Sequence, residues 1–528
     1  MTKLYDSSVI ARGTSRPLLL VAAFAFLLVR ISRPPVVYDE GLILVGADRI
    51  LLGEVPFRDF WNTHPPAQIW LVAGLFRLFG ESMVVLRVYD AAVKAGIALV
   101  LYLWARRLSD GAHAGAAACI LATIWLEFFG SFGFGYTAFP ALLLSLVSLG
   151  WLIDASDAET PARARRLIAG AGLCVGLAAL FRLDFGAYAA LTAVATLAVA
   201  ATSKDPRPRS MRVRGTALAL TSFGAAALAP AAVAVAVLAA QGVTTARLVD
   251  VLVTYPARVF PQYRGLPLPD LTVWRLAYYV PVWVAVAGLA RGGWLMHRRD
   301  GSRASALAWF SLSALALVSI PQARTRADMV HQAPVLLPSA ALAAALWFSL
   351  WRRRGPARAI ACALVPVVAL TYAAAPVYSW ARPGSTTATR AHGLPRAAGV
   401  AIEPDQAAAV RAVRQRTSPG DAIYVGNTRH DHIIRNDALF YFLAGRRYAT
   451  AYHNLLPGLA TRDEVQREIV EHLRATRPRC VVLCARFDGE TEPNASSLET
   501  GSRRLDDDIR QGYVFSVTIG AYQIGTAR

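Results

Sequence analysis

The chain has 528 residues, of which 55% are hydrophobic and only 17% are charged. Soluble domains contain about 25% charged residues, so this composition excludes an ordinary soluble protein and indicates a polytopic membrane protein. A formal net charge of +20 is compatible with a nucleic-acid-binding protein. The arginines, however, lie mainly between apolar segments and form no basic stripe with interleaved aromatic residues. We therefore expect no nucleic-acid partner.

Eleven apolar segments have the character of membrane-spanning helices, although several are shorter than ideal. A hydrocarbon core about 30 Å thick takes roughly 20 helical residues to cross. The segments are centred on residues 17–31, 83–104, 112–127, 137–153, 167–181, 185–202, 215–240, 274–290, 305–320, 332–351 and 357–377. The first has a basic flank but no small-residue cleavage site after it, which predicts an uncleaved signal anchor.

Basic residues are concentrated in alternate loops between these segments. The basic loops lie around residues 106–107, 163–166, 204–214, 298–303 and 352–358, whereas 32–82, 128–136, 182–184, 241–273 and 321–331 are poorer in them. Because basic loops stay in the cytoplasm, we expect a multi-pass protein of a bacterial inner membrane. Its N-terminus is then cytoplasmic and its C-terminal tail extracytoplasmic.

The chain loses its long apolar segments near residue 380, which predicts a membrane domain over 1–379 and a second domain over 380–528. In this tail, helical patterns cover 404–417 and 461–476, the latter with a capping box from Thr461 to Glu464. Strand patterns cover 421–426, 479–485 and 513–519. The alternation predicts a small, largely parallel α/β domain after a polytopic α-helical membrane domain.

The first outward loop, 32–82, begins with two adjacent carboxylates, Asp39 and Glu40. Acidic residues at a membrane edge are costly unless they meet water, a cation or a substrate, so they are candidates for function. They could also cap the helix that follows, whose N-terminus favours negative charge. Both interpretations can hold, since one carboxylate suffices as a cap.

The motifs of this loop resemble a known family. They are Asp39-Glu40, Gly53-x-x-Pro56-Phe57-x-Asp59-Phe60, His64-Pro65-Pro66, Leu78-Phe79-Gly80 and Arg87. They are similar to the first periplasmic loop of polyprenyl-phosphate-dependent glycosyltransferases of the GT-C fold, which include protein O-mannosyltransferases, lipid A aminoarabinose transferases and lipopolysaccharide galacturonosyltransferases. The resemblance is specific over 37–87 and extends in topology to about residue 377.

This resemblance implies that the loop forms two helices on the membrane surface and that Asp39 is the general base, with Glu40 beside it in a catalytic pair. His64 matches a family position, just before the Pro-Pro, where lysine or histidine is frequent, and its role stays open. The implied reaction is transfer of a sugar from a polyprenyl-phosphate donor to an extracytoplasmic glycan, lipid or protein. Asp39 and Glu40 could bind a divalent cation instead of taking a proton; no other cofactor is predicted.

Elementary chemistry agrees with this reading. Sugar transfer to a hydroxyl group needs a base near the acceptor oxygen and stabilisation of the departing phosphate. An inverting single displacement needs only one carboxylate. A site facing away from the cytoplasm, where nucleotide sugars are made, needs a donor carried by a membrane lipid.

Cations for the phosphate are available in the outward loops, because arginine recognises phosphate by bidentate hydrogen bonds. Arg324, Arg326, Asp328 and His331 precede the tenth span, in a pattern similar to a bacterial branch of this family. We predict that Arg326 holds the phosphate, with Arg324 as its substitute and His331 as a further substrate contact. The alternative is a turn with solvated charges.

Two more polar positions are predicted substrate contacts. One is His64 and the other is the pair Arg182 and Asp184, which could equally be a structural ion pair in a tight turn. By contrast, Tyr255, Phe260 and Tyr263 of segment 241–273 could stack on a sugar or anchor at the membrane interface, and anchoring is the preferred interpretation. His430 and His432 of the tail lack further ligands at metal-binding spacing, so the tail is interpreted as an accessory domain that shapes acceptor access.

A lipid-sugar flippase or transporter is the alternative function. Such proteins usually show internal repeats or broken helices that meet at the midplane. The sequence shows no convincing repeat, and its best polar cluster lies at one membrane edge. A non-catalytic scaffold for envelope assembly is a third reading.

Overall fold

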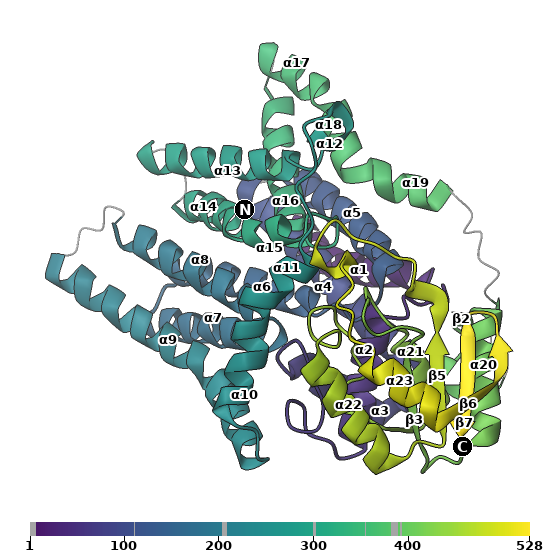
Figure 1. Cartoon of the computed structure of the whole chain (residues 1–528). Helices are drawn as coiled ribbons and strands as arrows, with labels where there is room; N and C mark the ends of the chain where they lie inside the picture. The colour runs from purple at the N-terminus through teal and green to yellow at the C-terminus, as the bar shows by residue number, and fades with distance from the viewer. Residues whose placement is uncertain are drawn as a thin grey trace.

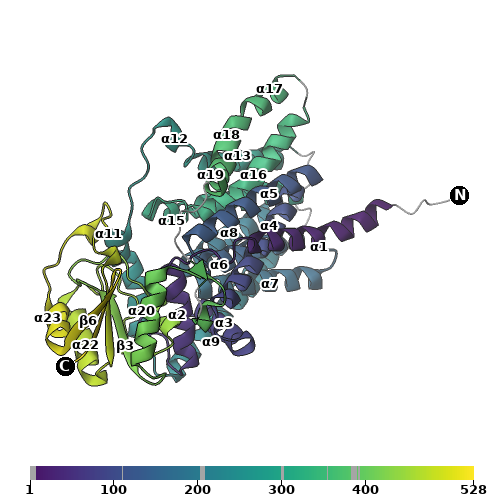
Figure 2. The same ribbon diagram turned by 90° about the vertical axis from the view of Figure 1, so that its right-hand side faces the viewer.

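A bundle of long helices carries a small sheet domain at one end, with the amphipathic helices of the first loop between them (Figures 1 and 2). The computed structural model describes residues 7–109, 111–202, 209–298, 303–353, 355–381, 389–390 and 393–528. This arrangement confirms the predicted class, a polytopic helical membrane protein with a small C-terminal α/β domain.

Eight of the described helical segments are long and apolar enough to cross a membrane. They are Ala112–Phe132, Ala138–Ser156, Pro161–Phe181, Leu183–Ala201, Gly215–Ala240, Arg303–Thr325, Ala333–Trp351 and Pro356–Ala381. Each coincides with a predicted span. The other three predicted spans fall on α1, α4 and α13, and α4 is less apolar because it carries Arg87, Asp90 and Lys94 within two turns.

The helices up to residue 381 have the following bounds. They are α1 (Ser7–Leu28), α2 (Asp39–Leu51), α3 (Ala67–Phe79), α4 (Met83–Ser109), α5 (Ala112–Phe129), α6 (Ala138–Ser156), α7 (Pro161–Phe181), α8 (Leu183–Thr202), α9 (Arg209–Ala240), α10 (Thr245–Val249), η2 (Asp250–Val259), α11 (Phe260–Arg264), α12 (Val273–Leu276), α13 (Val280–His297), α14 (Arg303–Val318), α15 (Ile320–Thr325), α16 (Ala333–Trp351), α17 (Pro356–Ala363), α18 (Val365–Ala369), η3 (Leu370–Ala374) and α19 (Ala375–Ala381).

The segment predicted as an outward loop, 241–273, is helical over much of its length, as α10, the π-helix η2 and α11. Tyr255 in η2 is buried, packs edge-on against Trp61 with ring centroids 5.4 Å apart, and donates to the Pro457 carbonyl at 3.4 Å. The interpretation of this aromatic residue as a membrane-interface anchor is therefore wrong. It joins the first loop to the tail instead.

The tail contains a five-stranded sheet in the order β4-β3-β5-β7-β6. Its elements are β1 (Thr389–Arg390), β2 (Ala401–Ile402), α20 (Pro404–Arg416), β3 (Ala422–Asn427), α21 (Leu439–Ala444), β4 (Arg447–Tyr448), α22 (Asp463–Thr476), β5 (Cys480–Cys484), α23 (Arg504–Gly512), β6 (Tyr513–Ile519) and β7 (Tyr522–Ala527). The three predicted strands and two predicted helices are confirmed to within two residues at each end.

Two details of the predicted tail are wrong. The sheet is mixed, because β3 runs parallel to β4 and β5 whereas β7 runs antiparallel to β5 and β6. The hairpin of β6 and β7 turns at Gly520, whose φ of 53° suits glycine. The expected capping box also fails: α22 begins at Asp463, and the Thr461 hydroxyl accepts the Gly458 N–H at 3.1 Å.

The tail touches the start of α2 directly. The Leu439 N–H of α21 donates to the Val37 carbonyl at 3.0 Å. Gly41 lies so close to α21 that a methyl group there would come within 2.4 Å of the Leu439 nitrogen, an approach that only glycine allows. The Tyr38 hydroxyl donates to Asn454 Oδ1 at 2.9 Å. The tail therefore contacts the chain on both sides of Asp39, at Val37 and Tyr38 before it and at Gly41 after it.

Candidate active site

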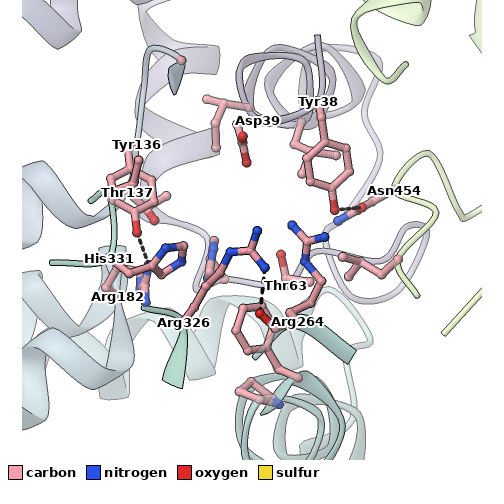
Figure 3. A pocket seen from close by; sticks show the side chains of 18 of the residues that line it. Tyr38, Asp39, Thr63, Tyr136, Thr137, Arg182, Arg264, Arg326, His331 and Asn454 are labelled. Carbon is pink, nitrogen blue, oxygen red and sulfur yellow. Dashed lines mark hydrogen bonds between the residues drawn. The ribbon is translucent and has the colours of Figure 1, made fainter. Parts of the chain in front are cut away.

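A cavity of about 980 Å³ lies where the bundle, the first loop and the tail meet. Among the residues predicted from the sequence, those that line it are Asp39, His64, Arg182, Asp184, Arg326, Asp328 and His331. The structure thus brings together, from three outward loops, seven of the nine predicted site residues. Figure 3 shows several of them around one open space.

Asp39 is the first residue of α2, and its carboxylate points into the cavity (Figure 3). Its side chain is accessible to solvent and lines this partly open cavity. Within the described residues it makes no hydrogen bond or ion pair. Burial raises the pKa of Asp39, and the charges of Arg264 and His331 offset this only in part. A carboxylate without a partner and with a raised pKa is suited to accept a proton.

Arg326 and Arg264 lie across the open space from Asp39 (Figure 3). Arg326 is positioned by the short bridge that its backbone forms with Leu266 and by donation from its Nη1 to the Arg264 carbonyl at 2.7 Å. Both guanidinium groups contact Glu492 of the tail: Arg326 through two hydrogen bonds of 2.9 and 2.8 Å, and Arg264 at 3.5 Å. The two arginines thus bind one carboxylate here, and guanidinium groups bind phosphate in the same bidentate way.

Asp328 connects Arg326 to His331. It accepts from Arg326 Nε at 2.9 Å and lies 2.7 Å from His331 Nδ1. Burial alone would raise the pKa of Asp328, but the contacts with His331 and Arg326 outweigh burial and lower it. The ionised carboxylate fixes the His331 ring and leaves its Nε2 free of this contact.

Arg182 and Asp184 form a bidentate ion pair at the cavity wall. Arg182 Nε and Nη2 donate to the two Asp184 oxygens at 2.9 and 2.8 Å, and Nη1 reaches the Tyr136 hydroxyl at 3.4 Å. The pair therefore orders the turn between α7 and α8 and also faces the cavity, so both sequence interpretations fit its position.

His64 lies in the turn before α3 and also faces the cavity. Burial, reinforced by the positive charge of Arg182, lowers the pKa of His64 to about 3. Its ring is therefore neutral at pH 7 and can both donate and accept a hydrogen bond.

Glu40 does not face the cavity, which corrects its predicted place in a catalytic pair. It is fully buried on the other side of α2, where Arg87 Nε and Nη2 donate to its oxygens at 2.7 and 2.9 Å. Successive residues of an α-helix point about 100° apart, so adjacent acids at its start face different surroundings. Glu40 and Arg87 form a structural ion pair, and Glu40 cannot chelate a cation together with Asp39.

Replacing Glu40 by glutamine should therefore destabilise the protein. Removing one partner of a buried ion pair leaves the other charge unpaired, which costs about 3–5 kcal/mol. Thermal unfolding of the purified protein in detergent should show a large fall in Tm for Glu40→Gln and almost none for Asp39→Asn. Equal Tm values for the two variants would contradict the structural role of Glu40.

Arg324 is the other predicted residue that the cavity excludes. It lies near the end of α15 with an exposed side chain. Arg326 follows the end of α15 in an extended conformation that turns it into the cavity, so Arg324 does not substitute for it in this arrangement.

No group of three or more His, Cys, Asp and Glu side chains in the described parts of the chain is arranged to hold a metal ion. In the tail, His430 is fully buried, with Nδ1 2.8 Å from Asp506 and Nε2 2.9 Å from the Tyr424 hydroxyl. Both ring nitrogens thus have protein partners, and His430 has a structural place in the tail.

Residues 63–234 match the family model described as dolichyl-phosphate-mannose-protein mannosyltransferase. The match covers about a third of the chain and includes His64, Arg182 and Asp184, but neither Asp39 nor Arg326. No curated protein sequence is similar enough to be matched.

Solved structures are similar over almost the whole chain. ArnT from Cupriavidus metallidurans in the apo state shares 14% identity at a TM-score of 0.58, covering 98% of this chain and 98% of that chain. The same protein bound to undecaprenyl phosphate shares 13% identity at a TM-score of 0.57, covering 96% of this chain and 97% of that chain. The apo oligosaccharyltransferase of Archaeoglobus fulgidus shares 13% identity at a TM-score of 0.56, covering 89% of this chain and 69% of that chain. This chain has the GT-C glycosyltransferase fold.

The resemblance of the first loop to GT-C proteins is thereby confirmed at the level of the fold. The cavity also contains residues that the sequence analysis did not select. Among them are Arg264 from α11 and, from the tail, Arg435, His453, Asn454, Glu490 and Glu492. The tail is thus part of the cavity wall in this GT-C fold. For Arg264, its position in an outward loop with few basic residues was a usable signal.

Proposed function

We propose that this GT-C protein transfers a sugar from a polyprenyl-phosphate donor to a hydroxyl group of an extracytoplasmic glycan, lipid or protein, with inversion at the sugar carbon. The observation that carries the proposal is the unpaired carboxylate of Asp39 facing Arg326 and Arg264 across one cavity. A base and a phosphate-binding group on opposite sides of a space suit in-line displacement.

In the proposed reaction, Asp39 accepts the proton of the acceptor hydroxyl as its oxygen attacks the anomeric carbon. The bond from that carbon to the phosphate oxygen breaks, and the polyprenyl phosphate leaves as an anion. Arg326 and Arg264 stabilise the negative charge that develops on the phosphate. His331, neutral His64 and the Arg182–Asp184 pair offer hydrogen bonds to sugar hydroxyl groups.

The comparisons support a lipid-linked donor without identifying the sugar. One similar structure, ArnT, is described as bound to undecaprenyl phosphate, and the matching family model is described by dolichyl-phosphate-mannose. The oligosaccharyltransferase has also been solved with zinc and sulfate. A cation at Asp39 stays a prediction for this chain, and no step of the proposed reaction depends on one.

The arrangement of basic loops supports an outward-facing cavity. Arg107 forms an ion pair with Asp154, and Arg352 Nη1 donates to the Ser109 carbonyl at 3.2 Å, so several basic loops gather at one end of the bundle. The cavity and the tail lie at the opposite ends of the same helices. Basic loops favour the cytoplasm. We therefore place the N-terminus on the cytoplasmic side of the inner membrane and the cavity and the C-terminal tail on its outer side.

A transfer assay separates this function from that of a flippase. The purified protein in lipid vesicles would be given a panel of radiolabelled polyprenyl-phosphate sugars with bacterial envelope extract as acceptor. We expect label to leave one donor and to appear in an acceptor. Label that crosses sealed vesicles while it stays on the carrier would instead support the flippase.

The pH dependence of transfer should report the ionisation of Asp39. The base acts only when deprotonated, and its pKa is raised, so kcat/KM should fall as the pH is lowered through a value above the usual aspartate pKa of about 3.9. Rates measured from pH 4 to pH 8 would test this. A profile that stays flat down to pH 4 would contradict the proposed environment of Asp39.

A further inference from the structure

Glu492 occupies the two arginines that we assign to the donor phosphate. Arg326 Nη1 and Nη2 donate to its two oxygens at 2.9 and 2.8 Å, and Arg264 Nη1 lies 3.5 Å from one of them. Glu492 belongs to the tail segment between β5 and α23, whereas Arg264 ends α11 and Arg326 follows α15, both before the tail. A carboxylate from the tail therefore holds the place that an anionic substrate would take.

The contact with Glu492 leaves Arg326 too few free N–H donors to bind a phosphate. A guanidinium group has five N–H donors. Arg326 uses four of them: Nε on Asp328, Nη1 on both the Arg264 carbonyl and Glu492, and Nη2 on Glu492. A phosphate oxygen could reach only the one that remains, so bidentate binding of phosphate requires Glu492 to leave.

The local charges lead to the same conclusion. Arg326 and Arg264 are balanced by the carboxylates of Glu492 and Asp328, which both lie in the same network. Contacts with the two arginines hold the pKa of Glu492 below its usual value despite burial, so it is ionised at pH 7. A phosphate would meet a nearly neutral cluster unless one carboxylate moves. Asp328 is also held by the His331 backbone N–H at 2.9 Å and by the His331 ring at 2.7 Å, whereas Glu492 accepts a further hydrogen bond of 3.0 Å from the neutral amide of Asn494.

The segment around Glu492 is fixed by bonds that do not involve the arginines. The Glu492 N–H donates to Ser497 Oγ at 2.8 Å, and Ser497 Oγ donates back to the Glu492 carbonyl at 2.7 Å. Asn494 Nδ2 donates to the Gly265 carbonyl at 2.8 Å. Asn494 Nδ2 also donates to Glu492 Oε2 at 3.0 Å. A change of rotamer breaks this one neutral hydrogen bond and releases the arginines while the backbone of Glu492 stays in place.

We propose that Glu492 is a displaceable counter-ion of the donor site. It pairs with Arg326 and Arg264 when the site is empty, yields them to the donor phosphate, and returns to them as the polyprenyl phosphate product departs. The product carries more negative charge than the donor, because its phosphate is a monoester rather than a diester, so a competing carboxylate matters most at product release. This inference rests on the proposed function.

Equilibrium binding of radiolabelled undecaprenyl phosphate to the full chain in lipid nanodiscs tests the proposal. Glu492→Gln keeps the shape of the side chain but removes its charge, so it competes less for the arginines. We expect about tenfold tighter binding, the equivalent of losing one charge-assisted competitor. In transfer assays, inhibition by added undecaprenyl phosphate should appear at about tenfold lower concentration.

The matched control is Glu499→Gln. Glu499 lies in the same tail segment, is paired with Arg429 at 2.7 Å, and does not line the cavity. The Glu499→Gln substitution changes the net charge by the same amount as Glu492→Gln. Because an exposed charge is screened by salt, its Kd for undecaprenyl phosphate should stay within about twofold of the wild-type value.

Three results would contradict the inference. Unchanged or weaker binding by Glu492→Gln would mean that Glu492 merely positions the arginines. Equal tightening by Glu499→Gln would mean that net charge alone acts. If neither the wild-type protein nor Arg326→Gln binds undecaprenyl phosphate, the proposed donor class itself is wrong, and the counter-ion role is wrong with it.

Discussion

Replacing Asp39 by asparagine should remove most of the sugar transfer while leaving the fold intact. Asparagine has nearly the same volume but cannot accept the acceptor proton. A positioned general base contributes about 10²–10⁴-fold to a rate, so kcat should fall by that factor. Donor binding should be retained, because Asp39 lies opposite Arg326 and Arg264 and forms no bond to either.

Two comparisons make this result specific. Asp270→Asn changes the same residue type at an exposed position in an outward loop, where Asp270 pairs with Arg275, and it should transfer normally. Glu40→Gln should show the opposite pattern to Asp39→Asn, with lost stability rather than a pure loss of kcat. Normal transfer by Asp39→Asn, with a normal Tm, would remove Asp39 from the reaction.

Replacing Arg326 by glutamine should weaken donor binding and slow transfer. A hydrogen bond from a charged group contributes about 1.5–3 kcal/mol, so the loss of the phosphate contact should raise Kd for undecaprenyl phosphate by about 10- to 100-fold. Arg326→Lys should rescue only part of this, since a lysine keeps the charge but not the bidentate geometry.

Arg324→Gln is the matched control for this prediction. Arg324 is two residues away, is exposed and does not line the cavity, so its loss should leave Kd unchanged. The double variant Arg326→Gln with Glu492→Gln should bind better than Arg326→Gln alone, because the unpaired Glu492 carboxylate would otherwise repel the phosphate. Equal Kd values for Arg324→Gln and Arg326→Gln would contradict the assignment.

The apolar segments and the first-loop motifs were readable from the sequence because they depend on local pattern. Eight spans are long apolar runs, and Asp39 follows the first predicted span within a family-like motif. Segment 241–273 was not readable as helical. Its prolines and polar residues are typical of a loop, and packing of Tyr255 against Trp61 and Pro457 helps to hold it as helix.

The cavity could be predicted only in part, since contacts between distant residues leave no local trace. Arg326 and Glu492 are 166 positions apart in the chain, and no spacing rule connects them. The adjacent pair Asp39 and Glu40 was misleading for a related reason. Their different roles depend on which neighbours lie on each side of α2: the cavity for Asp39 and Arg87 for Glu40.

The most direct test of this account is an experimental structure of the Asp39→Asn variant with undecaprenyl phosphate bound. We expect the phosphate oxygens at hydrogen-bond distance, about 2.7–3.2 Å, from Arg326 and Arg264. Glu492 should have left both arginines, and residue 39 should face the phosphate across the space left for the sugar. A phosphate bound away from these arginines, with the Arg326–Glu492 pair intact, would contradict the proposed site and its function.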